Sequence, residues 1–182
     1  MKEDTLKAED ATTAEVTSPG AGMQLFGFIE TLLLSLWLGA MVFFSFAVAP
    51  SAFAVLQSRH LAGLIVADTL KKVELIGLAA GAALILMQLA AWGFRRGRPA
   101  KTLKLLLLVV MTTTAALSRF WISPALGSIR TAMSSAIEDV PVTDPARVHF
   151  NDLHQYSVAL MTAAMLAGVF VLFLTVRSWL KR

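Results

Sequence analysis

Four long apolar runs without any charged residue dominate this sequence: residues 32–49, 75–94, 105–118 and 155–176. A bilayer core about 30 Å thick needs about 20 helical residues to cross it, and the shortest run has further apolar residues on both sides. Closed β-barrels also satisfy the backbone in hydrocarbon, but their strands alternate apolar and polar residues. These runs do not alternate. The sequence therefore predicts an all-α, integral membrane four-helix bundle.

The distribution of charge argues against a nucleic-acid partner, although the net charge is +4. Five basic residues gather in the short segment between the second and third runs: Arg95, Arg96, Arg98, Lys101 and Lys104. Basic loops of this kind are retained on the cytoplasmic side during membrane insertion. We therefore expect a multi-pass protein of the cell (inner) membrane, with both termini in the cytoplasm and the lipid bilayer as its main partner.

Two regions are predicted along the chain. Residues 1–22 are rich in Glu, Asp, Thr and Ala without apolar periodicity, which indicates a disordered acidic cytoplasmic tail. Residues 23–182 form the membrane domain, with spans at about 24–54, 73–94, 102–123 and 151–178. A cleaved signal peptide is the alternative for the first span, but its preceding segment is acidic and its apolar run exceeds the 7 to 15 residues of such peptides.

The polar flanks predict that helices extend beyond the lipid on the outer side. Residues 60–72 continue helically into the second span, and Asp144-Pro145 is typical of an N-cap followed by proline at the first helical position. Pro50 predicts a kink or end in the first helix. Apolar residues at helical spacing after Pro124 predict a separate interfacial helix; they are Leu126, Ile129, Met133 and Ile137.

Small residues four apart predict close helix packing in two spans. They are Gly77 and Gly81 in the second span, and Ala159, Ala163 and Ala167 in the fourth. Glu30 stands at the cytoplasmic end of the first span, where a nearby cation such as Lys104 is its expected partner.

The candidate ligand site is a stripe at the start of the fourth span. Arg147, Phe150, His154 and Ser157 follow one another at steps of three, four and three, which places them along one helix face. Together with Arg119 in the third span, they predict an outward-facing polar pocket in which arginines bind an anionic group and His154 is a titratable contact. The structural alternative is that the arginines reach the headgroup zone and His154 makes one hydrogen bond.

Acidic residues near this stripe predict a supporting ion-pair network. Glu74 and Asp152 are expected to pair with Arg119 and Arg147 around His154, because a charge buried alone in a membrane protein costs several kcal/mol.

Neither a metal site nor an enzyme is expected, and no cofactor is predicted. Three histidines and eight methionines include soft ligands that suit Cu(I), but His149 and His154 lie about 140° apart on a helix and no HxxxH or MxxM pair occurs. The chain has no cysteine and no nucleophile, phosphate-loop or HExxH motif.

Several short motifs resemble the transmembrane protein 205-like group, a family of uncharacterised four-helix membrane proteins with bacterial relatives. They are Trp37-Leu38-Gly39, Ala49-Pro50, Phe53, Phe120-Trp121-Ile122, Pro124, Arg130 and, most specifically, Asp144-Pro145, Arg147, Phe150, Leu153-His154 and Ser157. The resemblance spans about residues 25–177 and implies the fold and the choice of stripe, with no activity to carry over. Members of the group often have an asparagine a few residues after the serine that corresponds to Ser157, where this sequence has Leu160 or Met161.

Three functions remain open from the sequence. The leading hypothesis is a non-enzymatic bundle that binds a small ligand, an anionic group or a lipid headgroup. The alternative is an accessory or structural subunit, or a homo-oligomer, whose small-residue faces dock other membrane helices. A small transporter or metal-tolerance protein is the third, disfavoured because the inner halves of the spans offer few polar residues for a route: Glu30, Gln88 and Thr112 to Thr114.

Overall fold

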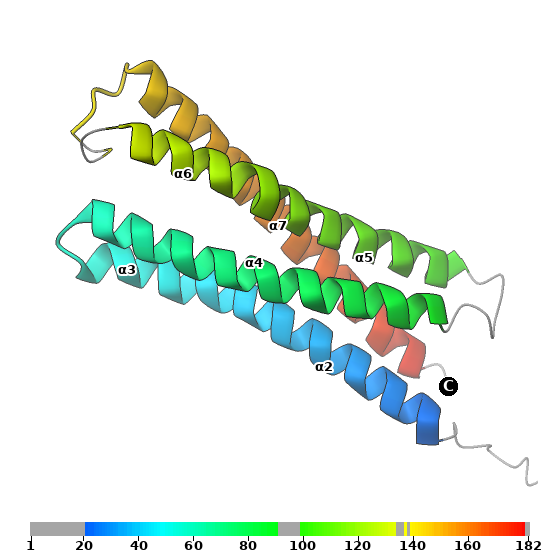
Figure 1. The fold of residues 1–182 in the computed structure, drawn as a ribbon. Helices are drawn as coiled ribbons and strands as arrows, with labels where there is room; N and C mark the ends of the chain where they lie inside the picture. The colour runs from blue at the N-terminus through cyan, green and yellow to red at the C-terminus, as the bar shows by residue number, and fades with distance from the viewer. Residues whose placement is uncertain (1–20, 91–98, 134–136, 138, 181–182) are drawn as a thin grey trace, which may run out of the picture.

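The computed structural model describes residues 21–90, 99–133, 137 and 139–180, which form four helical rods (Figure 1). The elements are α2 (Ala21–Phe43), η1 (Phe44–Val48) and α3 (Ala49–Val55) in the first rod; α4 (Arg59–Ala90) in the second; α5 (Pro99–Leu117), η2 (Ser118–Ile122) and α6 (Ser123–Ala132) in the third; and α7 (Pro145–Leu180) in the fourth. All four rods are long and apolar enough to cross a membrane. The predicted all-α membrane bundle is confirmed. The predicted tail falls on residues 1–20, outside the described residues, whereas Ala21 and Gly22 already belong to α2.

Neighbours in sequence are neighbours in space. The first rod packs on α4, α4 on α5, and α5 on α7, while α7 closes the bundle against α2. The turn from α3 to α4 and the connection from α6 to α7 lie at one end, which we call the hairpin end. The beginning of α2, the end of α7 and the facing ends of α4 and α5 lie at the other, the termini end (Figure 1).

The predicted helix extensions are present at the hairpin end. α4 runs without a break from Arg59, so the extension over residues 60–72 is confirmed. α7 begins at Pro145, and the Asp144 Oδ1 atom accepts a hydrogen bond of 2.8 Å from the backbone N–H of Ala146. The predicted N-cap is therefore confirmed, and the helix starts several residues before the predicted span.

Two π-helical turns carry the first and third rods past their prolines. In η1 the Ala49 N–H donates to the Phe44 carbonyl, one residue before Pro50, and in η2 the Ser123 N–H donates to the Ser118 carbonyl, one residue before Pro124. A proline ring in a regular α-helix clashes with the carbonyl four residues earlier, and the wider turn relieves that crowding.

The wider turns let both rods continue past their prolines. The first rod runs through Pro50 to Val55, and the predicted span reached about residue 54. The separate interfacial helix predicted after Pro124 is wrong: α6 is the continuation of the third rod, and it ends at Ala132, so Met133 and Ile137 lie outside it.

Trp37 fills the centre of the bundle because two glycines make room for it. A Cβ atom at Gly77 of α4 would overlap the Trp37 Nε1 atom, and one at Gly168 of α7 would lie 3.0 Å from Trp37 Cζ3. Similarly, a Cβ at Gly81 would overlap the Thr112 hydroxyl. The predicted packing role of Gly77 and Gly81 is confirmed. Around Trp37 lies a dry core of fully buried side chains: Leu34, Leu84, Leu108, Met111 and Val171.

The alanine face predicted on α7 is only partly correct. Ala167 is buried, but Ala159 and Ala163 are exposed, and the buried face instead contains Ala164 and Gly168. A spacing of four residues identifies small residues on one side of a helix, but it does not indicate which side faces the bundle. The buried side of a helix follows steps of three and four residues in alternation.

A buried ion pair ties the bundle together at its termini end. Lys104 Nζ of α5 pairs with Glu30 Oε1 of α2, and both side chains are about nine-tenths buried. Gln88 of α4 and Thr175 of α7 are also buried toward this end. The predicted partner of Glu30 is confirmed. Of the predicted basic loop, Arg95, Arg96 and Arg98 lie outside the described residues.

Candidate functional site

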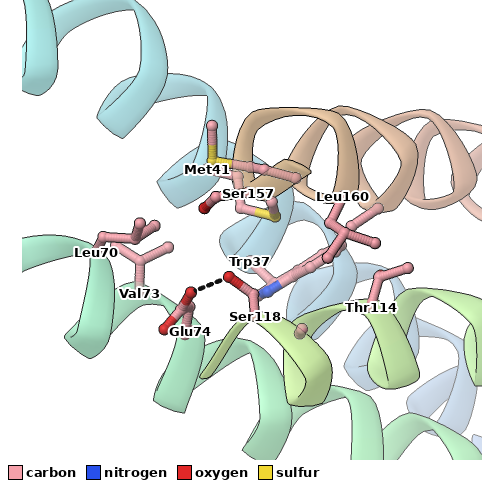
Figure 2. Close-up of a pocket in the computed structure, with 12 residues that line it drawn as sticks. Trp37, Met41, Leu70, Val73, Glu74, Thr114, Ser118, Ser157 and Leu160 are labelled. Atoms are coloured by element: carbon pink, nitrogen blue, oxygen red, sulfur yellow. Dashed lines mark hydrogen bonds between the residues drawn. The ribbon is translucent and has the colours of Figure 1, made fainter. Parts of the chain in front are cut away.

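Glu74 is a buried carboxylate on α4, only 7% exposed, on the hairpin side of the dry core. Two serine hydroxyls from the third rod donate to it. Ser118 Oγ lies 2.5 Å from Glu74 Oε1, and Ser123 Oγ lies 3.3 Å from both carboxylate oxygens. Figure 2 shows Glu74 and Ser118 facing each other across the space between the two rods.

The π-helical turn η2 is what allows both serines to reach the same carboxylate. Ser118 and Ser123 are five residues apart, which on an α-helix would separate their side chains by about 140°. Across η2 the hydrogen bond from the Ser123 N–H to the Ser118 carbonyl closes a turn of five residues instead of four. The two residues therefore stand nearly one above the other, and their hydroxyls form a serine clamp on Glu74.

A small cavity adjoins the serine clamp. Its volume is about 30 Å³, which is room for one or two waters or a single small ion. Its polar lining comes from Glu74, Thr114, Ser118 and Ser157, and its apolar lining from Trp37, Met41, Leu70, Val73, Ala115, Leu160, Met161 and Ala164 (Figure 2). Glu74 is thus the one charged side chain in the lining.

Ser157 contributes an unused hydroxyl to the cavity. It lies on α7, is 6% exposed, and among the described residues makes no hydrogen bond. No side-chain oxygen or nitrogen in the described part of the chain is both fully buried and without a partner, so this hydroxyl is not an orphan. Next to it, the Ser45 hydroxyl of η1 donates to the Met41 carbonyl and lies 3.8 Å from Met161 Sδ. Ser157 thus adds a hydroxyl group to the lining of the cavity from α7.

Glu74 differs from the other buried glutamate of the described structure in having no counter-ion. Glu30 forms an ion pair with Lys104, whereas Glu74 has only hydroxyl partners within the described residues. The charges of Arg119 and Lys71 act on Glu74, but neither side chain lines the cavity. Within the described residues Glu74 therefore forms no ion pair, and these two cations act on it from outside the cavity lining.

The stripe predicted on α7 divides into two parts. Ser157 is the one member of the predicted ligand-binding set, Arg119, Arg147, His154 and Ser157, that lines this cavity. Arg147 donates to the backbone carbonyl of Val140 and so fastens the connection that precedes α7. Arg119 is half-buried, as η2 places it next to Ser118.

His154 belongs to a cluster nearer the hairpin end. Its ring is stacked on Phe150, with ring centroids 6.4 Å apart and an interplanar angle of 7°. The Arg130 guanidinium lies 5.5 Å from the Phe150 centroid and donates to the Gly63 carbonyl at 3.3 Å. This cluster joins α6 to α4 and α7. Asp152 is exposed on α7, away from the buried carboxylate of Glu74.

The sequence singled out Ser157 as a ligand-binding residue and Glu74 as part of an ion-pair network, but it did not single out Ser118 and Ser123. The missing signal was the proline at position 124, which indicates a non-standard turn just before it and so a change of the residues that share a face. No group of three or more His, Cys, Asp or Glu side chains gathers in the described part of the chain. The polar groups that line the cavity are instead a carboxylate and hydroxyls, and the thioethers of Met41 and Met161 lie beside them.

Comparison with known proteins places the chain in a family. No curated protein sequence and no solved structure matches this chain. The family model described as a domain of unknown function, DUF4149, matches residues 32–135. The matched segment runs from the first rod to just beyond α6, so it includes Glu74 and both serines of the clamp but stops before α7. Since it covers more than half of the sequence, the chain belongs to the DUF4149 family.

Proposed function

We propose that this membrane protein binds a small cation at Glu74, inside the bundle. The observation that carries the proposal is a buried carboxylate that forms no ion pair within the described residues and that lines a small cavity. An ionised carboxylate in apolar surroundings costs several kcal/mol unless a positive charge compensates it. Glu30 has Lys104 for this purpose, and Glu74 takes its positive charge from solution, as a proton or a metal ion.

The geometry favours a cation over the anionic group or lipid headgroup that the sequence suggested. A carboxylate at the cavity wall repels anions, and the Arg147 guanidinium is already engaged by the Val140 carbonyl. Binding is also favoured over passage through the bundle. The dry core around Trp37 lies between this cavity and the polar residues Glu30 and Lys104 at the termini end.

The alternative role as an accessory subunit has less support. Gly77 and Gly81, the small residues proposed to dock other helices, are occupied by Trp37 and Thr112 of the same chain. Kinship with the transmembrane protein 205-like group is a further proposal. It rests chiefly on the motif Arg147, Phe150, His154 and Ser157, which lies beyond the matched segment.

Carbodiimide labelling tests the cation proposal, because an apolar carbodiimide modifies carboxyl groups that carry a proton in apolar surroundings. Wild type in detergent is expected to be modified at Glu74, less so as the pH rises, and Glu74→Gln is expected to abolish the product seen by mass spectrometry. The matched control is Glu30→Gln, which removes the other buried glutamate and should leave the Glu74 product intact. Wild-type protein that stays unmodified at Glu74 from pH 5 to pH 9 would contradict the proposal.

The proposed orientation places the hairpin end outside and both termini in the cytoplasm. Because the chain has no cysteine, single cysteines report sidedness directly. Gln57, exposed in the α3–α4 turn, and Thr102, exposed near the start of α5, mark the two ends. We expect a membrane-impermeant maleimide to label Gln57→Cys in intact cells, but Thr102→Cys only after lysis. The reverse pattern would invert the orientation.

A further inference from the structure

We infer that the cation held by Glu74 is a proton, and that Glu74 exchanges it only with the hairpin side, the side of the membrane that the hairpin end faces. This inference rests on the proposed function and names both the ion and its side of entry. It is carried by the position of the carboxylate. Glu74 stands where the apolar spans end, it is hydrogen-bonded to the partly exposed Ser123, and the dry core lies on its other side.

The lining of the cavity suits a proton and not a metal ion. Eight of its twelve residues are apolar, and Ser123 is not among them. A bare metal ion needs several oxygen ligands, whereas a proton on one carboxylate oxygen needs a single acceptor. A serine hydroxyl can donate or accept a hydrogen bond, so the serine clamp can hold Glu74 in both its ionised and its protonated form.

Glu74 lies at the level where the apolar spans end on the hairpin side. The uncharged runs of α4, the third rod and α7 end there at Glu74, Arg119 and His154. Figure 2 shows that α4, the third rod and α7 meet at this level around the cavity. Lys71, about one helical turn before Glu74, is exposed. The proton therefore has about 5 Å, one turn of helix, to travel to water on that side.

Ser123 connects the carboxylate to the hairpin side. Its hydroxyl lies 3.3 Å from both carboxylate oxygens of Glu74, and it is partly exposed, whereas Ser118 is buried. On dissociation the carboxyl O–H bond breaks, its electron pair stays on Glu74, and the proton passes to water on this side. The charges of Arg119 and Lys71 favour the ionised carboxylate that remains.

The dry core closes the termini side. Its fully buried side chains, which surround Trp37, lie between the cavity and the ion pair at the termini end. On α4 the next buried polar residue in that direction is Gln88, about 21 Å further along the helix at 1.5 Å per residue. Thr112 and Thr114 of α5 lie at intermediate depth, but their hydroxyls donate to carbonyls of their own helix. The described core therefore offers no chain of hydroxyls for a proton.

One other titratable group at this level must be separated from Glu74. The charged neighbours are Lys71 on α4 and Arg119 on the third rod, and α7 carries His154 at the same level. The described first rod adds none, since its charged residue, Glu30, lies at the termini end. Histidine is the side chain that ordinarily titrates near neutral pH, so His154 needs its own control.

The test sets the pH separately on the two sides of proteoliposomes that contain the Gln57→Cys protein. An impermeant biotin-maleimide added outside marks the molecules whose hairpin end faces out, and capture after solubilisation separates the two orientations. With acidic buffer outside and alkaline buffer inside, we expect carbodiimide to modify Glu74 at least about tenfold more in the captured molecules. The protonated fraction of a carboxyl falls about tenfold for each pH unit above its pKa. Reversing the gradient should reverse the ratio.

His154→Gln is the control for the titrating group, and it should keep the full ratio. Loss of the ratio in that variant would assign the pH dependence to the histidine and overturn the inference. Equal modification of the two orientations, or modification that follows the termini-side pH, would overturn the sided exchange. Protection of Glu74 by sodium chloride but not by choline chloride at equal pH would overturn the proton assignment. In these last two cases labelling of Glu74 would still depend on pH, so the broader proposal would stand.

Discussion

Lys104→Met is expected to destabilise the bundle by about 3–5 kcal/mol, which is the usual cost of leaving a buried charge without its partner. Lys104 and Glu30 lie on rods that are not neighbours in the bundle, and both are about nine-tenths buried. Removal of the ammonium leaves the Glu30 carboxylate in apolar surroundings. The measurement is reversible unfolding in mixed detergent micelles, followed by circular dichroism.

The double variant Glu30→Met/Lys104→Met is the control for that result. It removes both charges and fills their space with apolar side chains, and such replacements of buried ion pairs are often neutral or stabilising. We therefore expect the double variant to recover most of the stability lost in Lys104→Met. If the two variants were equally unstable, the loss would come from packing of the lysine stem and not from the orphaned carboxylate.

Gly77→Ala is expected to destabilise the bundle by about 1–3 kcal/mol, the cost of forcing an extra methyl group into a packed core. The new Cβ would overlap Trp37 Nε1, and Trp37 cannot retreat because Gly168 packs against its other side. The same unfolding measurement applies. Trp37 fluorescence adds a local report when the other tryptophans of the chain are replaced by phenylalanine.

Gly39→Ala is the matched control, since a Cβ there meets nothing within 4 Å. An alanine in a helix is intrinsically favoured over glycine by roughly 0.5–1 kcal/mol, so this variant should be as stable as wild type or more so. Equal losses at positions 39 and 77 would mean that the contact with Trp37 is not the reason for the glycine.

The features that could be predicted from sequence are those set by local chemistry and by the bilayer. Length and absence of charge located the four spans, and the capping preference of aspartate before proline located the start of α7. The partner of Glu30 was also predictable, because a carboxylate near the end of an apolar run must find a cation and Lys104 lies at the matching depth.

The serine clamp could not be predicted in the same way. On an α-helical projection Ser118 and Ser123 point in different directions, so they look unrelated. Only the π-helical turn before Pro124 brings them together, and whether a proline kinks, ends or widens a helix depends on its tertiary neighbours. The sequence analysis placed Glu74 among arginines for a related reason. Opposite charges are the partners that a pattern search finds first, whereas two serines five residues apart on another helix form no recognisable pattern.

The ion pair between the first and third rods also constrains how the protein is made. Ribosomes add about 5–20 residues per second, and Lys104 is synthesised only after all of α4 has followed Glu30. For several seconds the first two helices must therefore be in the translocation machinery or the membrane while Glu30 has no lysine to meet. Glu30 therefore gains its partner only when the third helix arrives, so the first helix reaches its full stability in the membrane after more than half of the chain has been made.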